Sequence, residues 1–195
     1  FGEEYTLVAV ADYVLSRRRG NTVSNLSSSR ALRDVTQSRG GQYFASAVGE
    51  VNVVEMMKSV DAVIGGEGNG GVIVPDLHYG RDALAGIALF LSLAAGYEGA
   101  ISGLRREYPD YFMVKDKISL QPGTDMTALL DRLHERFSRE QCNTVDGLKI
   151  DFPDGWVHLR RSNTEPIIRI YSESTSEQRA REMVEMMKGE LEGFS

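Results

Sequence analysis

The sequence predicts an α/β fold followed by a smaller α+β fold. In the first part of the chain, short apolar runs alternate with amphipathic helical patterns, which is typical of a mostly parallel sheet covered on both faces. In the last part, three short strand patterns follow one another directly between single helical patterns, which favours an antiparallel sheet. We therefore expect a mostly parallel α/β/α sandwich domain, followed by a smaller domain with an antiparallel sheet and two packing helices.

The elements of the first part follow from where apolar side chains recur and where turn residues interrupt them. Apolar side chains recur at helical spacing through residues 5–19, and Gly20-Asn21 ends this pattern. The later elements alternate in type. The sequence predicts helices over residues 5–19, 29–38, 51–59 and 81–95, and strands over residues 22–26, 43–48 and 62–64.

The last of these helices contains the longest apolar run of the chain. Residues 83–95 carry no charged side chain, and Gly86 and Ser92 interrupt the run. The run falls short of the roughly 18 residues that would suggest a membrane span. We therefore expect a buried helix and no membrane partner.

A boundary between two domains is expected between residues 96 and 110. Glycines recur there, and Tyr108-Pro109-Asp110 predicts a turn after which the order of elements changes. We expect domains over residues 1–108 and 109–195. In the second domain the sequence predicts strands over residues 111–120, 144–152, 156–160 and 167–172, and helices with one apolar stripe over residues 124–137 and 176–191.

Composition excludes several classes of function. The 28 acidic and 22 basic side chains give a pI near 5.2 and no positive footprint for a nucleic acid. The single cysteine, Cys142, rules out an intrachain disulfide and fits a reducing compartment, so we expect the cytoplasm. His78, His134 and His158 are scattered, and Cys142 has no partner at metal-ligand spacing. We expect no metal site within these residues.

The stretch GGEGNGG at residues 65–71 follows an apolar strand pattern and satisfies the dinucleotide fingerprint G-x-G-x-x-G. That fingerprint requires a helix to open at the glycines, whereas the following residues continue as extended chain, so an NAD-dependent oxidoreductase is the weakest alternative. Five glycines let a ligand approach the backbone, and Glu67 and Asn69 offer the acceptors and donors that recognise hydroxyl groups. The alternative is a glycine-rich turn with a solvated glutamate.

The second polar stretch is RRSNTEP at residues 160–166, between two strand patterns. Its guanidinium, hydroxyl and amide donors can surround a dianionic phosphate, and charge-assisted hydrogen bonds of roughly 1.5–3 kcal/mol each could hold a phosphoester. Pro166 starts the next strand without needing a donor. The alternative is a polar hairpin with a surface salt bridge. The candidate ligands are Arg160, Ser162, Asn163, Thr164 and Arg169, of which Arg169 braces the loop or reaches the ligand.

Together the two stretches resemble the motifs of the α-D-phosphohexomutases, which interconvert hexose 6-phosphates and hexose 1-phosphates through a bisphosphate intermediate. In that family a GExSG-type loop of the third domain contacts sugar hydroxyls, and an R-x-S-N/G-T-E/T-P loop of the fourth domain holds the phosphate that is not transferred. Both spacings and their order agree with this chain. The match extends over nearly the whole chain and includes VGEVN at residues 48–52 and YGRD at residues 79–82.

The resemblance implies that residues 1–108 are the third domain, without its first strand, and that residues 109–195 are the fourth. It also implies a phosphorylated hexose and the amino-terminal domains of the same protein as partners. The implied sugar-binding residues are Glu67, Gly68, Asn69, Gly70 and, at the rim of the third domain, Glu50, and the implied phosphate-binding residues are Arg160, Ser162, Asn163, Thr164 and Arg169.

Two departures limit what the resemblance implies. Asn69 stands where many relatives have serine, which leaves open whether the hexose is glucosamine, mannose or glucose. The family's T-x-S-H-N-P phosphoserine loop and D-x-D-x-D-R magnesium loop are not in these residues, so we expect no catalytic residue here, Mg²⁺ ligands outside this chain, and no turnover by the chain alone. Ser27-Ser28-Ser29 lacks the following histidine and is expected to cap the helix that begins near Arg30. A non-catalytic sugar-phosphate-binding module is the alternative to part of a mutase.

Overall fold

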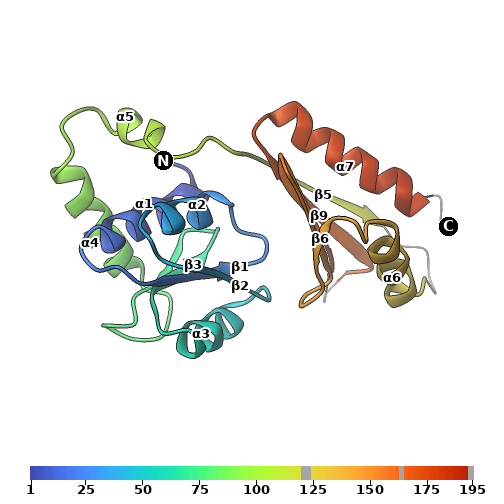
Figure 1. Cartoon of the computed structure of the whole chain (residues 1–195), viewed down its shortest axis with the longest axis horizontal. Coiled ribbons are helices and arrows are strands. Elements are labelled where there is room, and N and C mark those ends of the chain that lie inside the picture. Colours follow the sequence, from blue (N-terminus) through green and yellow to red (C-terminus); the bar gives the residue numbers. More distant parts are fainter. Residues whose placement is uncertain (120–123, 163–164, 193–195) are drawn as a thin grey trace. The chain divides into compact units, whose positions relative to one another are not determined.

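The structure, a computed structural model, describes residues 1–119, 124–162 and 165–192. The chain divides into two compact units, Phe1–Asp110 and Tyr111–Ser195, which are described separately (Figure 1). No helix within the described residues is both long enough and apolar enough to cross a membrane.

The first unit is built on a four-stranded sheet in the order β2-β1-β3-β4. The first three of these run parallel, and the short β4 pairs antiparallel with β3 at the edge. All six residues of β3 are buried, as expected for a strand with helices on both faces of its sheet. The strands are β1 (Asn21–Asn25), β2 (Tyr43–Ser46), β3 (Ala62–Glu67) and β4 (Gly71–Ile73).

Helices cover both faces of this sheet, which confirms the predicted α/β/α class. In Figure 1, α1 and α2 lie on one face of the sheet and α3 lies on the other. The apolar α4 packs beside α1, but the prediction that it is buried is wrong, because only Ala85 and Gly86 of this helix are buried. The helices are α1 (Glu3–Leu15), α2 (Ala31–Ser38), α3 (Glu50–Ser59), α4 (Ala83–Ala95) and α5 (Ile101–Arg106).

The sequence did not predict α5, which lies in the stretch expected to be irregular. Its six residues are too few to show a helical period. Two contacts fix it within the first unit. Leu104 is buried, and the guanidinium of Arg105 lies 3.4 Å from the centre of the Tyr5 ring.

The second unit is built on a five-stranded sheet in the order β5-β9-β8-β7-β6, in which every pair is antiparallel. This confirms the predicted antiparallel sheet with two helices. The elements are β5 (Phe112–Ser119), α6 (Met126–Arg136), β6 (Gln141–Asn143), β7 (Leu148–Phe152), β8 (Gly155–Arg161), β9 (Ile167–Ser174) and α7 (Glu177–Glu192).

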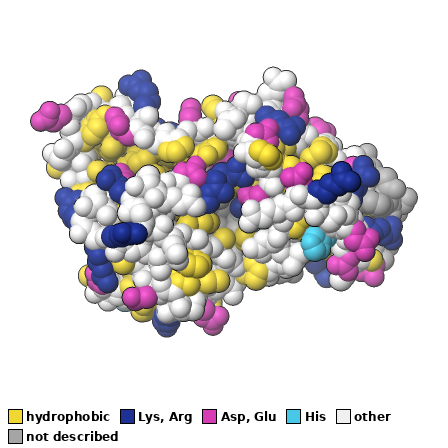
Figure 2. Space-filling model, viewed as in Figure 1, with side chains coloured by type: hydrophobic (Ala, Val, Ile, Leu, Met, Phe, Trp, Pro, Cys, Tyr) yellow, Lys and Arg dark blue, Asp and Glu magenta, His cyan; other side chains and the backbone are white. Residues whose placement is uncertain are grey.

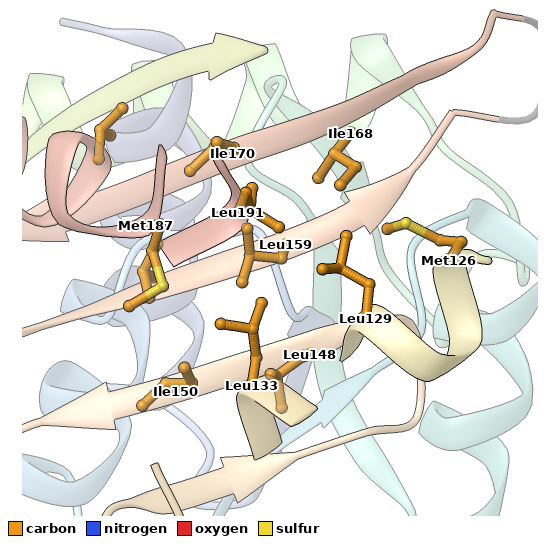
Figure 3. Packing of buried hydrophobic residues seen from close by; sticks show 12 residues of the cluster. Met126, Leu129, Leu133, Leu148, Ile150, Leu159, Ile168, Ile170, Met187 and Leu191 are labelled. Carbon is orange, nitrogen blue, oxygen red and sulfur yellow. The ribbon is translucent and has the colours of Figure 1, made fainter. Parts of the chain in front are cut away.

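Both helices of the second unit pack on the same face of its sheet. Their apolar stripes meet alternate residues of β7, β8 and β9, so that Leu133 and Met187 belong to one cluster with Leu159 (Figure 3). Successive side chains of a strand point to opposite faces. His158, Arg160 and Arg169 therefore lie on the face that the helices do not cover.

One predicted strand begins later than expected, and the strand before it was not predicted. Residues 144–152 were expected to form a single strand, but only β7, at residues 148–152, does so, and it forms a hairpin with β6, which ends at Asn143. The Asn143 side chain accepts a hydrogen bond from the Val145 N–H at 3.0 Å, and Gly147 has a φ of +75°, in the left-handed region that favours glycine. These two residues turn the chain where its apolar pattern looked continuous.

Candidate functional site

The glycine stretch forms the turn of the β3–β4 hairpin, at the carboxyl end of the parallel strands. Glu67 still pairs with Gly71, and Gly70 has a left-handed φ of +83°. Asn69 is exposed, and its Oδ1 accepts a hydrogen bond from the Gly71 N–H at 3.1 Å. No helix opens at these glycines, since α4 begins only at Ala83. This geometry does not fit a dinucleotide site, where a helix N-terminus faces the pyrophosphate.

Glu67 is a buried carboxylate whose position is fixed by two partners. Asn25, the last residue of β1, donates from Nδ2 to Glu67 Oε1 at 2.9 Å. Arg81, just before α4, places its Nη1 3.6 Å from Glu67 Oε2. Because a buried carboxylate is costly without such partners, Asn25 and Arg81 determine where Glu67 points.

Ser28 fixes the backbone of the same turn, and Glu4 lies beside it. The Ser28 hydroxyl donates to Asn25 Oδ1 at 3.1 Å and accepts from the Gly68 N–H at 3.0 Å. Glu4 lies so close to Gly68 that a Cβ at that position would overlap its carboxylate. A side chain at position 68 would have to displace the Glu4 carboxylate, whose Oε2 accepts a hydrogen bond from the Ser29 N–H at 3.0 Å.

Glu50 opens α3 and joins this network through Arg81. The Arg81 N–H donates to Glu50 Oε1 at 2.9 Å, and Arg81 Nε donates to Oε2 at 2.8 Å. These hydrogen bonds, the backbone one first, hold the pKa of Glu50 below its usual value. Arg81 thus contacts the carboxylates of both Glu50 and Glu67. Carboxylates that already share a guanidinium do not fit a divalent cation, and no other acidic, histidine or cysteine cluster in the described part of the chain does.

Three members of this network were missed as site residues by the sequence reasoning. Asn25, Ser28 and Arg81 each hold either Glu67 or the backbone beside it. For Asn25 a signal was present, because a polar residue at the carboxyl end of a parallel strand lies at the edge where ligands usually bind. The serine triplet does not supply the N-cap of α2, which is Arg30 and has no side-chain cap, but Ser29 Oγ accepts a hydrogen bond from the Ala31 N–H at 3.2 Å.

The second candidate site lies at the end of the β8–β9 hairpin. Ser162 is buried, and its N–H donates to the Ile167 carbonyl oxygen at 3.0 Å. The Ile167 N–H in turn donates to the Glu165 carbonyl oxygen at 2.8 Å. Two further residues predicted to bind phosphate, Asn163 and Thr164, lie outside the described residues.

Arg160 is held at this hairpin by Asp146 from the β6–β7 turn. Arg160 Nε lies 2.8 Å from Asp146 Oδ2, which makes an ion pair, but the buried Nε–H has no well-directed hydrogen bond. His158 fixes the turn itself, because its Nε2 lies 2.7 Å from the Asp146 carbonyl oxygen. Asp146 therefore fixes where the Arg160 guanidinium lies, and His158 fixes the turn that carries Asp146.

Three cations lie side by side on the uncovered face of the sheet. Arg160 is directly opposite Arg169, and Arg169 is directly opposite Lys117 of β5. Within the described residues neither Arg169 nor Lys117 forms an ion pair. Like charges directly opposite each other destabilise a sheet, so this row favours a bound anion.

Both units match one protein family. Residues 2–111 match "Phosphoglucomutase/phosphomannomutase, alpha/beta/alpha domain III", and residues 114–190 match "Phosphoglucomutase/phosphomannomutase, C-terminal domain". The phosphoglucomutase/phosphomannomutase of Thermococcus kodakarensis is 37% identical over 93% of this chain and 40% of its own length. The phosphoglucosamine/phosphogalactosamine mutase of Sulfurisphaera tokodaii is 33% identical over 88% of this chain and 38% of its own. The chain therefore spans about two fifths of the length of these relatives.

Solved structures show the same fold. A phosphoglucomutase/phosphomannomutase family protein from Burkholderia thailandensis has a TM-score of 0.79 at 25% identity, and the match covers 97% of this chain and 41% of that one. The N-acetylphosphoglucosamine mutase of Aspergillus fumigatus, solved with GlcNAc-6P and magnesium, has a TM-score of 0.65 at 13% identity, over 97% of this chain and 46% of that one. The second likeness concerns the fold alone.

The matches in both units, together with the order of the two polar loops, show that this chain belongs to the phosphoglucomutase/phosphomannomutase family, of which it carries domain III and the carboxy-terminal domain.

Proposed function

We propose that this chain is the carboxy-terminal part of a phosphosugar mutase that interconverts hexose 6-phosphate and hexose 1-phosphate through a bisphosphate intermediate. The observation that carries the proposal is that both units match consecutive domains of one mutase family, with the two polar loops in the same order. The named relatives support phosphoglucosamine, phosphomannose or phosphoglucose as the substrate. The single cysteine supports the cytoplasm as the compartment.

In this proposal the glycine turn recognises the sugar. Glu67 accepts hydrogen bonds from sugar hydroxyls, and Asn69 contributes its amide next to it. Asn25 and Arg81 keep the buried Glu67 carboxylate in place before the sugar arrives. The backbone of Gly68 and Gly70 lets the sugar approach the turn closely, while Glu50 acts through Arg81.

The β8–β9 hairpin holds the phosphate that is not being transferred. Arg160 and Arg169 supply positive charge from neighbouring strands, and Ser162 supplies its hydroxyl group at the turn. Asn163 and Thr164 complete the proposed clamp by their place in the motif. Phosphoryl transfer depends mostly on positioning and charge neutralisation, so groups of this kind contribute without forming covalent bonds to the substrate.

The transferred phosphoryl group must be handled by the rest of the protein. The sequence contains neither the family's phosphoserine loop nor its magnesium loop, and the carboxylates of Glu50 and Glu67 contact Arg81. We therefore place the Mg²⁺ ligands and the phosphoserine in the amino-terminal domains. Mg²⁺ bound there would neutralise charge on the transferred group. After the first transfer the bisphosphate must reorient by about half a turn, so that its other phosphate faces the phosphoserine. The sugar therefore binds to Glu67 and Asn69 in two opposite orientations.

A titration with hexose phosphate tests the clamp. Glucose 6-phosphate and glucosamine 6-phosphate should shift the amide signals of Ser162 and its neighbours in the 195-residue chain. Arg160→Ala should weaken this binding by about tenfold to a hundredfold, because it removes a charge-assisted interaction of roughly 1.5–3 kcal/mol. Arg161→Ala is the matched control. Arg161 is exposed and lies opposite Ile168, so it is on the other face of the sheet from Arg160 and Arg169. Unchanged spectra at millimolar ligand, or equal effects of both variants, would contradict the clamp.

The full gene separates the mutase from a non-catalytic sugar-phosphate-binding module. The codons before Phe1 should encode both the phosphoserine loop and the magnesium loop, and the whole protein should convert one phosphohexose into the other. A whole protein that binds hexose phosphate through Arg160 but lacks both loops would establish the binding module instead.

A further inference from the structure

One face of α4 is apolar and exposed. The helix has 13 residues and none of them is charged. Leu84, Ile87 and Leu91 are 79%, 55% and 60% exposed, and Ala88 and Ala95 continue the same stripe at three- and four-residue spacing. Figure 2 shows hydrophobic side chains at the surface of the first unit in several places. A helix that is apolar on all sides is normally buried on all sides, so the exposed face of α4 has the character of an interaction surface.

The opposite side of α4 is already packed. Ala85 and Gly86 are buried, and a Cβ on Gly86 would come within 3.3 Å of Val72 Cγ2 in β4. Asp82 caps the helix by accepting a hydrogen bond from the Ala85 N–H at 2.9 Å. The helix is therefore fixed to the unit by one side, and its exposed face cannot turn inward.

The side chains of the exposed face have no polar group that needs water as a hydrogen-bond partner. The hydroxyl group of this face, on Ser92, donates to the Ala88 carbonyl oxygen of the same helix at 2.7 Å. The other side chains of the stripe are purely aliphatic. A partner that covers this stripe gains from burying apolar surface and leaves no charged side chain of the stripe unpaired.

The first residue of the chain lies against the same helix. The Phe1 ring packs edge-on against the Phe90 ring of α4, with centroids 4.9 Å apart, and also against Tyr108 at 6.4 Å. Phe1 is still 42% exposed. Any segment that precedes Phe1 in the protein therefore enters the first unit beside α4.

We propose that the exposed face of α4, formed by Leu84, Ile87, Ala88, Leu91 and Ala95, is the docking surface for the amino-terminal domains of the same polypeptide. This inference rests on the proposed function, which places two further domains before the matched domain III. The entry point at Phe1 favours this occupant over a second copy of the chain, because a tethered partner is present at high effective concentration. Two copies would in addition each bring a formal net charge of −6.

Thiol alkylation at residue 91 tests the docking surface. Leu91→Cys in a Cys142→Ser background is labelled in the 195-residue chain and in the whole protein, and modification is measured by mass spectrometry on the peptide that contains residue 91. Val51→Cys is the matched control, since Val51 is 69% exposed on α3, on the other face of the sheet. We expect the Leu91→Cys rate to fall at least tenfold in the whole protein at every concentration, with Val51→Cys unchanged. Ile87→Cys repeats the measurement should Leu91→Cys perturb the helix.

Each other outcome overturns the proposal. Equal Leu91→Cys rates in both proteins mean that the amino-terminal domains do not cover α4. Alkylation of Leu91→Cys that slows in both proteins, and only as the protein concentration rises, means that a second copy of the chain covers α4. A gene with no domain before Phe1 also overturns it. Mutase activity of the whole protein tests the proposed function separately. An active whole protein in which Leu91→Cys is alkylated rapidly contradicts the docking surface alone. An inactive whole protein in which Leu91→Cys is alkylated slowly contradicts the mutase function alone.

Discussion

Acidification should destabilise the second unit through His158. This imidazole is 1% exposed, and its Nε2 lies 2.7 Å from the Asp146 carbonyl oxygen, so the neutral ring carries its proton on Nε2. Burial is the main cause that lowers the pKa of His158 from 6.5 to about 4, and the positive charges of Lys149 and Arg160 lower it further. The Asp146 carbonyl and carboxylate oppose this shift.

The sign and size of the effect follow from the two pKa values. Between about pH 6.5 and 4 the unfolded chain binds a proton on His158 that the folded chain does not, so the free energy of unfolding falls as the pH falls. The contribution of neutral His158 to the free energy of unfolding is fully present above about pH 6.5. It is lost by about pH 4, below which His158 is protonated in both states. A difference of that size corresponds to a loss of about 3 kcal/mol, at about 1.4 kcal/mol per pH unit.

Trp156 provides the assay. It is the only tryptophan of the chain, it is fully buried in the second unit, and its indole N–H donates to Glu173 at 2.8 Å. Urea unfolding followed by its fluorescence therefore reports on this unit. His158→Gln keeps an N–H donor but cannot titrate, so its free energy of unfolding should change by about 3 kcal/mol less than that of the unmodified protein between pH 7 and 4.

His134→Gln is the control for replacing a histidine by glutamine, because His134 is exposed on α6. Two results would refute the reasoning. One is a parallel pH dependence of the His158→Gln variant and the unmodified protein. The other is an NMR titration that places the pKa of His158 in the folded chain near 6.5.

Three further substitutions test other parts of the structure. Asn25→Ala should destabilise the first unit by about 1–3 kcal/mol in urea unfolding followed by circular dichroism, because Glu67 loses a buried donor, while the exposed Asn52→Ala should cost less than about 0.5 kcal/mol. Gly147→Ala should destabilise the second unit by more than about 1 kcal/mol by Trp156 fluorescence, because φ is +75° and a Cβ would overlap the Leu159 carbonyl oxygen; Gly189→Ala, in open space on α7, should stabilise it by up to about 1 kcal/mol. Lys117→Gln should weaken hexose phosphate binding several-fold at low salt, and Lys115→Gln, two residues farther from the hairpin turn, should weaken it less.

Periodicity and turn residues carried most of the fold. The alternation of short strands and amphipathic helices predicted the class of both units, because side chains that repeat every two or every 3.6 residues must bury one face or stripe. The prediction was wrong where local turn chemistry overrode an apolar pattern. Asn143 and Gly147 divide residues 144–152 into a turn and β7, and their effect is visible only once the backbone dihedrals are known.

The candidate site was only partly visible in the sequence. Motif spacing drew attention to Glu67 and Arg160, since a glycine stretch and a cluster of donors each indicate a kind of ligand. The residues that hold them come from distant parts of the chain: Asn25 lies 42 positions before Glu67, and Asp146 belongs to a separate hairpin from Arg160. Contacts of this kind depend on strand order and register, which no local pattern reveals.

The apolar α4 illustrates a different limit. Its composition predicts burial on every side, yet Ala85 and Gly86 are the only buried residues of this helix. The apolar sequence of a helix reflects every neighbour that the helix has in the natural protein. The exposure of its side chains in this structure reflects only the neighbours within these 195 residues. For α4 this difference is the observation on which the proposed docking surface rests.

Glu67 and Asn69 differ in how firmly the fold holds them, and the difference agrees with a site that accepts a sugar in two senses. Glu67 is buried and fixed by Asn25 and Arg81, whereas Asn69 is exposed and tied only to its own turn through Oδ1. Both oxygens of a carboxylate accept, so Glu67 can receive hydroxyls in either sense without moving. The Asn69 amide still has its NH₂ group as a donor, on a side chain that can turn. In the proposed site the fixed acceptor therefore carries affinity common to all substrates, and replacing Asn69 should change the preference among hexoses more than the binding of all of them.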